Sequence, residues 1–101
     1  MKEIKWLAHR IEEELEDAET YAKEAAKHKD TNRGLSQTLA QICKEELGHS
    51  EMLHIQAERL IAAQREAGIT APSAMQAVWD WEHEKMIEHT ARIKHLLDML
   101  K

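Results

Sequence analysis

The chain has 101 residues, of which 33% are charged, and it carries a formal net charge of −5. This length suffices for one domain with a modest core, and the negative balance argues against a nucleic-acid partner, because phosphates call for a basic surface. The single cysteine, Cys43, excludes an intrachain disulfide. No apolar run reaches membrane-spanning length, and we do not expect the first residues to act as a signal peptide. We therefore expect a cytoplasmic protein without membrane or nucleic-acid partners.

Composition and turn signals together predict an all-α protein with three helices. The chain contains three glycines and one proline, and it is rich in alanine, glutamate, leucine and lysine. Two clusters of turn-forming residues interrupt it, D-T-N-R-G at 30–34 and A-G-I-T-A-P-S at 67–73. The predicted helices cover about 3–29, 35–67 and 73–100. Helices of about 30 residues are roughly 45 Å long, which is typical of bundles, and we expect a single helical domain over 1–101.

The first predicted helix carries a core-facing stripe with one acid in it. The stripe, at three- and four-residue spacing, consists of Ile4, Leu7, Ile11, Glu14, Ala18, Tyr21 and Ala25. Removing a lone carboxylate from water costs several kcal/mol, so buried acids are rare unless they are paired or bound to a metal. Glu14 therefore needs a partner.

The second predicted helix places an acid and a histidine on its stripe. This stripe consists of Leu35, Leu39, Ile42, Glu46, His49, Leu53, Gln56, Leu60 and Ala63. Glu46 and His49 are three positions apart, so their side chains lie one above the other on one helix face. A divalent metal is the simplest common partner for two glutamates and a histidine in one core. Carboxylate oxygens and a neutral imidazole suit iron or manganese, and are less typical of structural zinc.

The third predicted helix offers a weaker match to the same pattern. Its stripe consists of Trp79, His83, Met86, Thr90, Ile93, Leu97 and Leu100. Asp80 and His83 could complete a site within one chain, although one carboxylate would still be missing. The more frequent role of such a histidine is hydrogen-bonded packing. Glu51 and His54, in the second helix, lie about 140° around it from the first pair and are expected at the surface or at a secondary site.

Counting the candidate ligands predicts a dimer. A di-iron centre in a four-helix bundle uses one glutamate from each of two helices and a Glu-x-x-His motif from each of the other two. The first two helices of this chain supply half of that set, and a two-fold dimer would complete it on the symmetry axis. We expect one two-metal site per dimer, in which Glu46 bridges both metals, Glu14 is a terminal ligand and His49 binds one metal.

Two segments resemble the ferritin-like superfamily: E-E-L-E-D-A-E-T-Y at 13–21 and E-E-L-G-H at 45–49. In that superfamily a ligand glutamate is followed seven residues later by a tyrosine, and Glu-x-x-His comes on the next helix. The half-length chain is similar to the encapsulated ferritins in particular, over about residues 8–60. The resemblance implies a ferritin-like antiparallel helical hairpin, followed here by a third C-terminal helix, with a four-helix-bundle di-iron site completed by dimerisation.

The resemblance also implies roles for individual residues. The iron ligands, and hence the catalytic residues of a ferroxidase, would be Glu14, Glu46 and His49. Tyr21 would contact these ligands without binding the metal itself. Glu13 and Glu16 would form an acidic relay for incoming ferrous iron. The chain departs from the family at Thr20, where an aromatic residue is expected, and in its third segment, which is longer than the family's short terminal helix.

The partners follow from the same resemblance. It implies two iron ions per dimer, with manganese or zinc as substitutes. It implies a homodimer that assembles into a larger ring. It also implies residence as cargo inside an encapsulin shell, which would supply the cavity for mineral that a 101-residue bundle lacks.

Three functions remain open on the sequence. The leading interpretation is a ferroxidase that oxidises Fe(II) to Fe(III) and feeds iron storage and detoxification. The second is a rubrerythrin-like di-iron or di-manganese protein that scavenges peroxide. The third is a metal-free helical oligomerisation module. The sequence argues against the third, because four core acids per dimer would face only two histidines.

Overall fold

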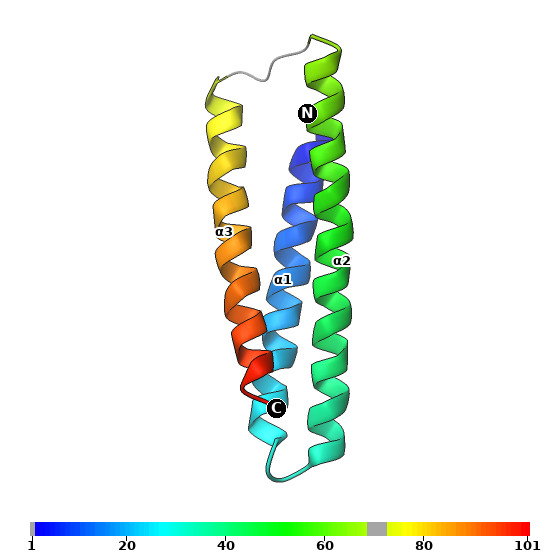
Figure 1. The fold of residues 1–101 in the computed structure, drawn as a ribbon, viewed down its shortest axis with the longest axis vertical. Coiled ribbons are helices and arrows are strands. Elements are labelled where there is room, and N and C mark those ends of the chain that lie inside the picture. Colours follow the sequence, from blue (N-terminus) through cyan, green and yellow to red (C-terminus); the bar gives the residue numbers. More distant parts are fainter. Residues whose placement is uncertain (1, 69–72) are drawn as a thin grey trace.

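The computed structural model describes residues 2–68 and 73–101, which form three helices (Figure 1). The helices are α1 (Lys2–His28), α2 (Arg33–Glu66) and α3 (Ser73–Asp98). The all-α prediction is confirmed, and the predicted helix ends differ from the observed ones by at most two residues. The described residues contain no strand, and none of their helices is both long and apolar enough to span a membrane.

The first helix is the centre of the arrangement. α1 and α2 form an antiparallel hairpin, and α3 runs back beside α1 in the same direction as α1 (Figure 1). α1 packs against both other helices, whereas α2 and α3 approach each other only loosely. The molecule is 56 Å long and 18 Å across, so every side chain on α1 lies near a neighbouring helix or at the surface of a thin rod.

Local chemistry fixes the ends of α2 and the hairpin turn before it. The side chain of Asn32 accepts a hydrogen bond from the backbone N–H of Leu35 at 3.1 Å, which caps the first turn. The buried hydroxyl of Ser36 donates to the carbonyl oxygen of Ala25 at 2.7 Å and thereby ties α2 to α1 near the turn. Gly68 follows α2 with φ +75°, a left-handed conformation that glycine adopts without strain.

The core lies along the small-residue face of α1. The buried cluster consists of Ile11, Leu15, Ala18, Ala22, Cys43, Met86 and Ile93. The stripe predicted for the first helix is confirmed, since all of its members are buried except Tyr21, which is partly buried. In α3 the stripe residues Met86 and Ile93 are buried as predicted.

The core-facing stripe predicted for α2 is wrong, because a neighbouring row of residues on the helix faces α1 instead. The buried residues of α2 are Ser36, Cys43, Ser50 and Ala57, spaced seven apart. Small side chains at this spacing let α2 approach α1 closely, so the larger apolar residues lie beside the line of contact rather than on it. We call this row of partly exposed residues the α2 flank: Leu35, Leu39, Ile42, Leu53 and Leu60.

On the opposite side of α2, a groove of about 670 Å³ separates it from α3. We call it the α2–α3 groove. Ile11 and Leu15 of α1 contribute to its lining, together with Leu47 and His54 of α2 and His83 of α3. The two sides of α2 thus carry two different open surfaces, the α2 flank and the α2–α3 groove.

Candidate metal centre

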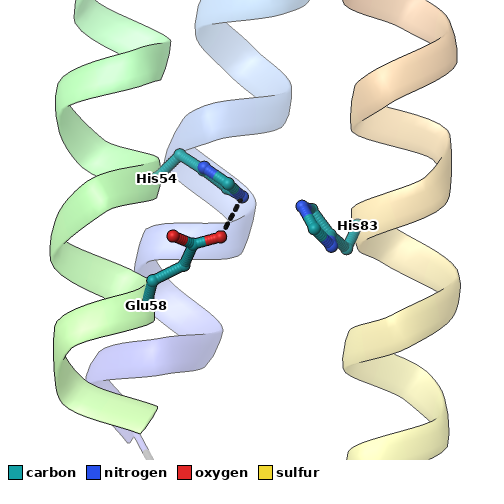
Figure 2. A group of neighbouring side chains, drawn as sticks. All are labelled: His54, Glu58 and His83. Atoms are coloured by element: carbon teal, nitrogen blue, oxygen red, sulfur yellow. Dashed lines mark ion pairs between the residues drawn. The ribbon is translucent and has the colours of Figure 1, made fainter. Parts of the chain in front are cut away.

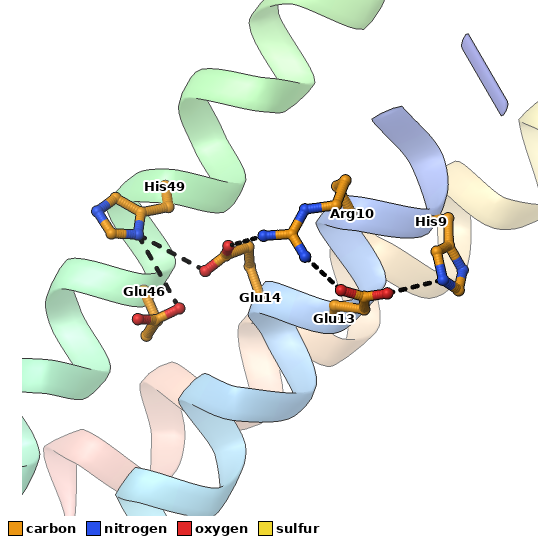
Figure 3. Close-up of polar contacts among 6 residues, drawn as sticks. All are labelled: His9, Arg10, Glu13, Glu14, Glu46 and His49. Atoms are coloured by element: carbon orange, nitrogen blue, oxygen red, sulfur yellow. Dashed lines mark hydrogen bonds and ion pairs between the residues drawn. The ribbon is translucent and has the colours of Figure 1, made fainter. Parts of the chain in front are cut away.

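Glu14 lies midway along α1 with only 12% of its side chain exposed. Arg10, one helical turn earlier, donates a hydrogen bond from Nη2 to Oε1 of Glu14 at 2.8 Å (Figure 3). This contact holds the carboxylate in one orientation and compensates part of the cost of burying it. The second oxygen, Oε2, is directed toward α2.

Glu46 and His49 meet Glu14 from α2. Nδ1 of His49 lies 3.6 Å from Oε2 of Glu14 and 4.0 Å from Oε2 of Glu46 (Figure 3). One ligand atom from each of the three residues lies within 4.8 Å of the others. The structure therefore brings together the three residues that the sequence pattern indicates, in a His/Glu group suited to holding a metal ion. We call it the Glu14 group.

Glu14 perturbs the ionisation of Glu46. A hydrogen bond with Glu14, burial and the negative charge of Glu14 raise the pKa of Glu46 from 4.5 to about 7, although His49 opposes the rise. Glu46 therefore keeps its proton to a higher pH than an ordinary glutamate does in the absence of a metal. A divalent cation can take the place of that proton, because ligand carboxylates bind metals in their ionised form.

The Glu14 group is open on one side. The exposed fraction of the side chain is 20% for Glu46 and 56% for His49. The expectation that His49 lies in the core is therefore wrong within one chain. The buried line of α2 runs through Ser50, and at 100° per residue a neighbouring side chain points well away from it. His49 lies instead on the side of the helix that carries the α2 flank.

The remaining residues of the sequence hypothesis lie close by in α1. Tyr21 is partly buried against the core, two turns after Glu14. Glu13 forms ion pairs with Arg10 and with His9, the latter at 2.7 Å (Figure 3). Glu16 is exposed. An acidic relay through Glu13 would thus compete with two cationic or potentially cationic partners, whereas Glu16 is open to solvent.

A second group of metal-ligating side chains lies on the other side of α2. It consists of His54 and Glu58 of α2 and His83 of α3 (Figure 2). Nε2 of His54 lies 3.5 Å from Oε1 of Glu58. The rings of His54 and His83 stack with their centroids 4.7 Å apart. We call it the His54 group.

The sequence pattern indicates both histidines of the His54 group but gives them other carboxylate neighbours. It matched His54 with Glu51 and His83 with Asp80, each through a three-residue spacing. In the structure Asp80 is exposed and accepts a hydrogen bond from Gln76 at 3.0 Å, so it does not complete the Glu14 group. The usable signal was the four-residue spacing from His54 to Glu58, combined with the position of His83 on the stripe of the third helix.

Comparison with models of protein families, with curated proteins and with solved structures finds no match to this chain. In the part of the chain that the structure describes, the protein has three helices, with an α1–α2 hairpin and a C-terminal helix, and two His/Glu groups that could hold metal ions.

Proposed function

We propose that two copies of this chain build a two-metal centre from Glu14, Glu46 and His49, and that ferrous iron is oxidised there as the substrate. The observation that carries the proposal is the convergence of two carboxylates and one imidazole within 4.8 Å, at a partly buried point between two helices. The chain would thus act as a ferroxidase. The resemblance of residues 13–21 and 45–49 to the encapsulated ferritins supports the same function.

The charges of the Glu14 group fit a divalent cation. Two ionised carboxylates balance one Fe²⁺, and a neutral imidazole adds a ligand without adding charge. The raised pKa of Glu46 is what a carboxylate pair without such a cation displays, since one carboxyl holds a proton up to about pH 7. Arg10 engages only one oxygen of Glu14, so the other is left for a terminal ligand bond.

A dimer supplies what one chain lacks. Three side chains are half of the four-carboxylate, two-histidine set of a di-iron bundle. The open side of the group coincides with the α2 flank, where Leu35 is 38% exposed and the other four members are partly exposed. A two-fold axis along this flank would bury the apolar row and bring a second Glu14 group against the first. A single interface would therefore both bury the apolar row and complete the set of ligands.

The reaction needs an oxidant from solution. Two ferrous ions give up one electron each, and dioxygen takes two electrons and two protons to become hydrogen peroxide. Carboxylates suit the change because they can shift between terminal and bridging modes as the positive charge rises. The larger ring and the encapsulin shell belong to the same proposal and rest on the sequence resemblance.

An anaerobic titration tests the proposal. Purified metal-free protein is titrated with Fe²⁺ while light scattering follows its mass, and air is then admitted while the ferric absorbance is recorded. We expect saturation at one iron per chain, a dimer or larger species, and fast oxidation. Glu46→Gln and His49→Ala should lose uptake and oxidation. Glu45→Gln and His95→Ala, which change exposed residues, should retain both.

Two outcomes would contradict the proposal. One is the absence of iron uptake by a folded protein. The other is equal uptake and oxidation by the wild type, Glu46→Gln and His49→Ala. Replacing dioxygen by peroxide as the oxidant separates the ferroxidase from a peroxide scavenger, because the scavenger turns over peroxide in preference to dioxygen and does not accumulate ferric product.

A further inference from the structure

The His54 group joins two helices that otherwise touch only loosely. His54 and Glu58 extend from α2, and His83 extends from α3 toward them (Figure 2). One ligand atom of each residue lies within 4.8 Å of the other two. Apart from Glu46 with His49 in the Glu14 group, the other histidine–carboxylate pairs within one helix, such as His9 with Glu13, have no third ligand from a neighbouring helix in the described residues.

The polar atoms of the His54 group are poorly satisfied without a ligand. Nε2 of His54 is buried and has no hydrogen-bond partner, although Glu58 lies 3.5 Å away. A buried ring nitrogen in this state costs free energy, which a bond to a partner would recover. The rings of His54 and His83 also stack face to face with their centroids 4.7 Å apart, which keeps the two imidazoles side by side. Two imidazoles beside a carboxylate are a metal-binding donor set.

We propose that His54, Glu58 and His83 form a second metal site, separate from the Glu14 group and selective for a divalent ion of the zinc class. Two imidazole nitrogens and one carboxylate oxygen are a donor set of tetrahedral zinc, with the fourth position left for water or another small ligand. The richer share of imidazole nitrogen distinguishes this group from the carboxylate-rich Glu14 group, which suits iron or manganese. His54 and His83 line the α2–α3 groove, from which a small ligand could reach the fourth position.

A metal ion bound to the His54 group would link α2 to α3, and we call this link the clamp. In the described structure α3 is held mainly by α1, for example through Arg92, whose Nε donates to Glu19 at 3.2 Å. A metal ion held by α2 and α3 together adds a link where the bundle is loosest. Because the ion binds only when the helices are in place, it stabilises the folded chain.

Cobalt titration tests this site apart from the Glu14 group. The parent protein is the full chain with Glu46→Ala and His49→Ala, which removes the first group, and Co²⁺ is the probe because its visible absorbance reports tetrahedral coordination. We expect one Co²⁺ per chain, displaced by Zn²⁺. Adding His83→Ala should weaken affinity by roughly tenfold or more, since even loss of a supporting partner of a ligand has an effect of that size. Adding His95→Ala, an exposed histidine of α3, should leave affinity unchanged.

Equal Co²⁺ affinity with and without His83, or no binding by a parent that retains its helical circular dichroism, would overturn the proposal. If the parent loses its helicity, the comparison is made in the otherwise wild-type chain through the rise in Tm caused by Zn²⁺. His83→Ala should reduce that rise and His95→Ala should not, and an equal rise in both would overturn the proposal. His83→Ala should still take up and oxidise iron, so failure of the clamp and failure of the ferroxidase are distinguishable.

Discussion

Replacing Glu46 with glutamine should stabilise the metal-free protein at pH 8 and leave its stability almost unchanged at pH 4. In the folded chain the hydrogen bond with Glu14, burial and the charge of Glu14 keep the proton on Glu46 up to a pKa of about 7, against an ordinary value of 4.5. As pH rises between these values, the unfolded chain releases a proton that the folded chain retains. The Glu46 carboxyl therefore lowers the free energy of unfolding as pH rises, and this decrease is complete above pH 7. Glutamine does not ionise, so the variant does not show this decrease in the free energy of unfolding.

The size of the effect follows from the two pKa values. A rise from 4.5 to about 7 corresponds to roughly 3 kcal/mol. Solvent around a side chain that is 20% exposed screens this to roughly 1–2 kcal/mol. Urea unfolding at pH 4, 6 and 8 in the presence of a chelator measures it, with Glu45→Gln as the matched control for an exposed neighbour. If Glu46→Gln changes stability equally at pH 4 and pH 8, the raised pKa of Glu46 is refuted.

Three further predictions concern the scaffold. Leu15→Ala, at a fully buried position, should cost about 2–5 kcal/mol in urea unfolding, and a cost below about 1 kcal/mol would contradict the packing described for α1. Burial raises the pKa of Glu19, but the hydrogen bond from Arg92 and the charge of His89 outweigh it, so the pKa lies below 4.5 and its stabilisation is lost as pH falls. Glu19→Gln should therefore destabilise by up to about 1 kcal/mol at pH 7 and hardly at pH 3, whereas an equal loss at both would refute the ion pair. Burial raises the pKa of the Cys43 thiol to about 11, so iodoacetamide should label the folded protein far more slowly than the urea-unfolded one, and equal rates would place Cys43 at the surface.

The sequence predicted α1 well because its signal is unambiguous. Its large apolar residues and its alanines fall on the same face, so the periodicity alone was enough to place Glu14 among them. In α2 the two kinds of residue lie on different faces. Leu35 and Ile42 mark the most apolar side, whereas Cys43 and Ser50 mark the side that comes closest to α1. A stripe chosen by hydrophobicity alone therefore points to the flank, where the Glu14 group is exposed.

Local patterns can point to the members of the His54 group, but for a different reason they cannot show that these residues meet. His54 and His83 belong to separate helices, and they meet only if α3 packs on α1 at a position that brings it close to α2. No spacing within a helix encodes that distance. The same limitation applies to the dimer: the exposed His49 and the apolar α2 flank indicate a face that a partner would cover, but the geometry of two copies is set by contacts that one chain does not contain.

The shared two-metal centre is tested most directly by a crystal structure of the protein loaded with Fe²⁺ or Mn²⁺ under anaerobic conditions, with the metals located by anomalous scattering. We expect two metal peaks about 3.5–4 Å apart on either side of a two-fold axis. Glu14, Glu46 and His49 of both copies should ligate them. A metal held within a single chain, or the absence of metal from intact Glu14 groups, would contradict the shared centre.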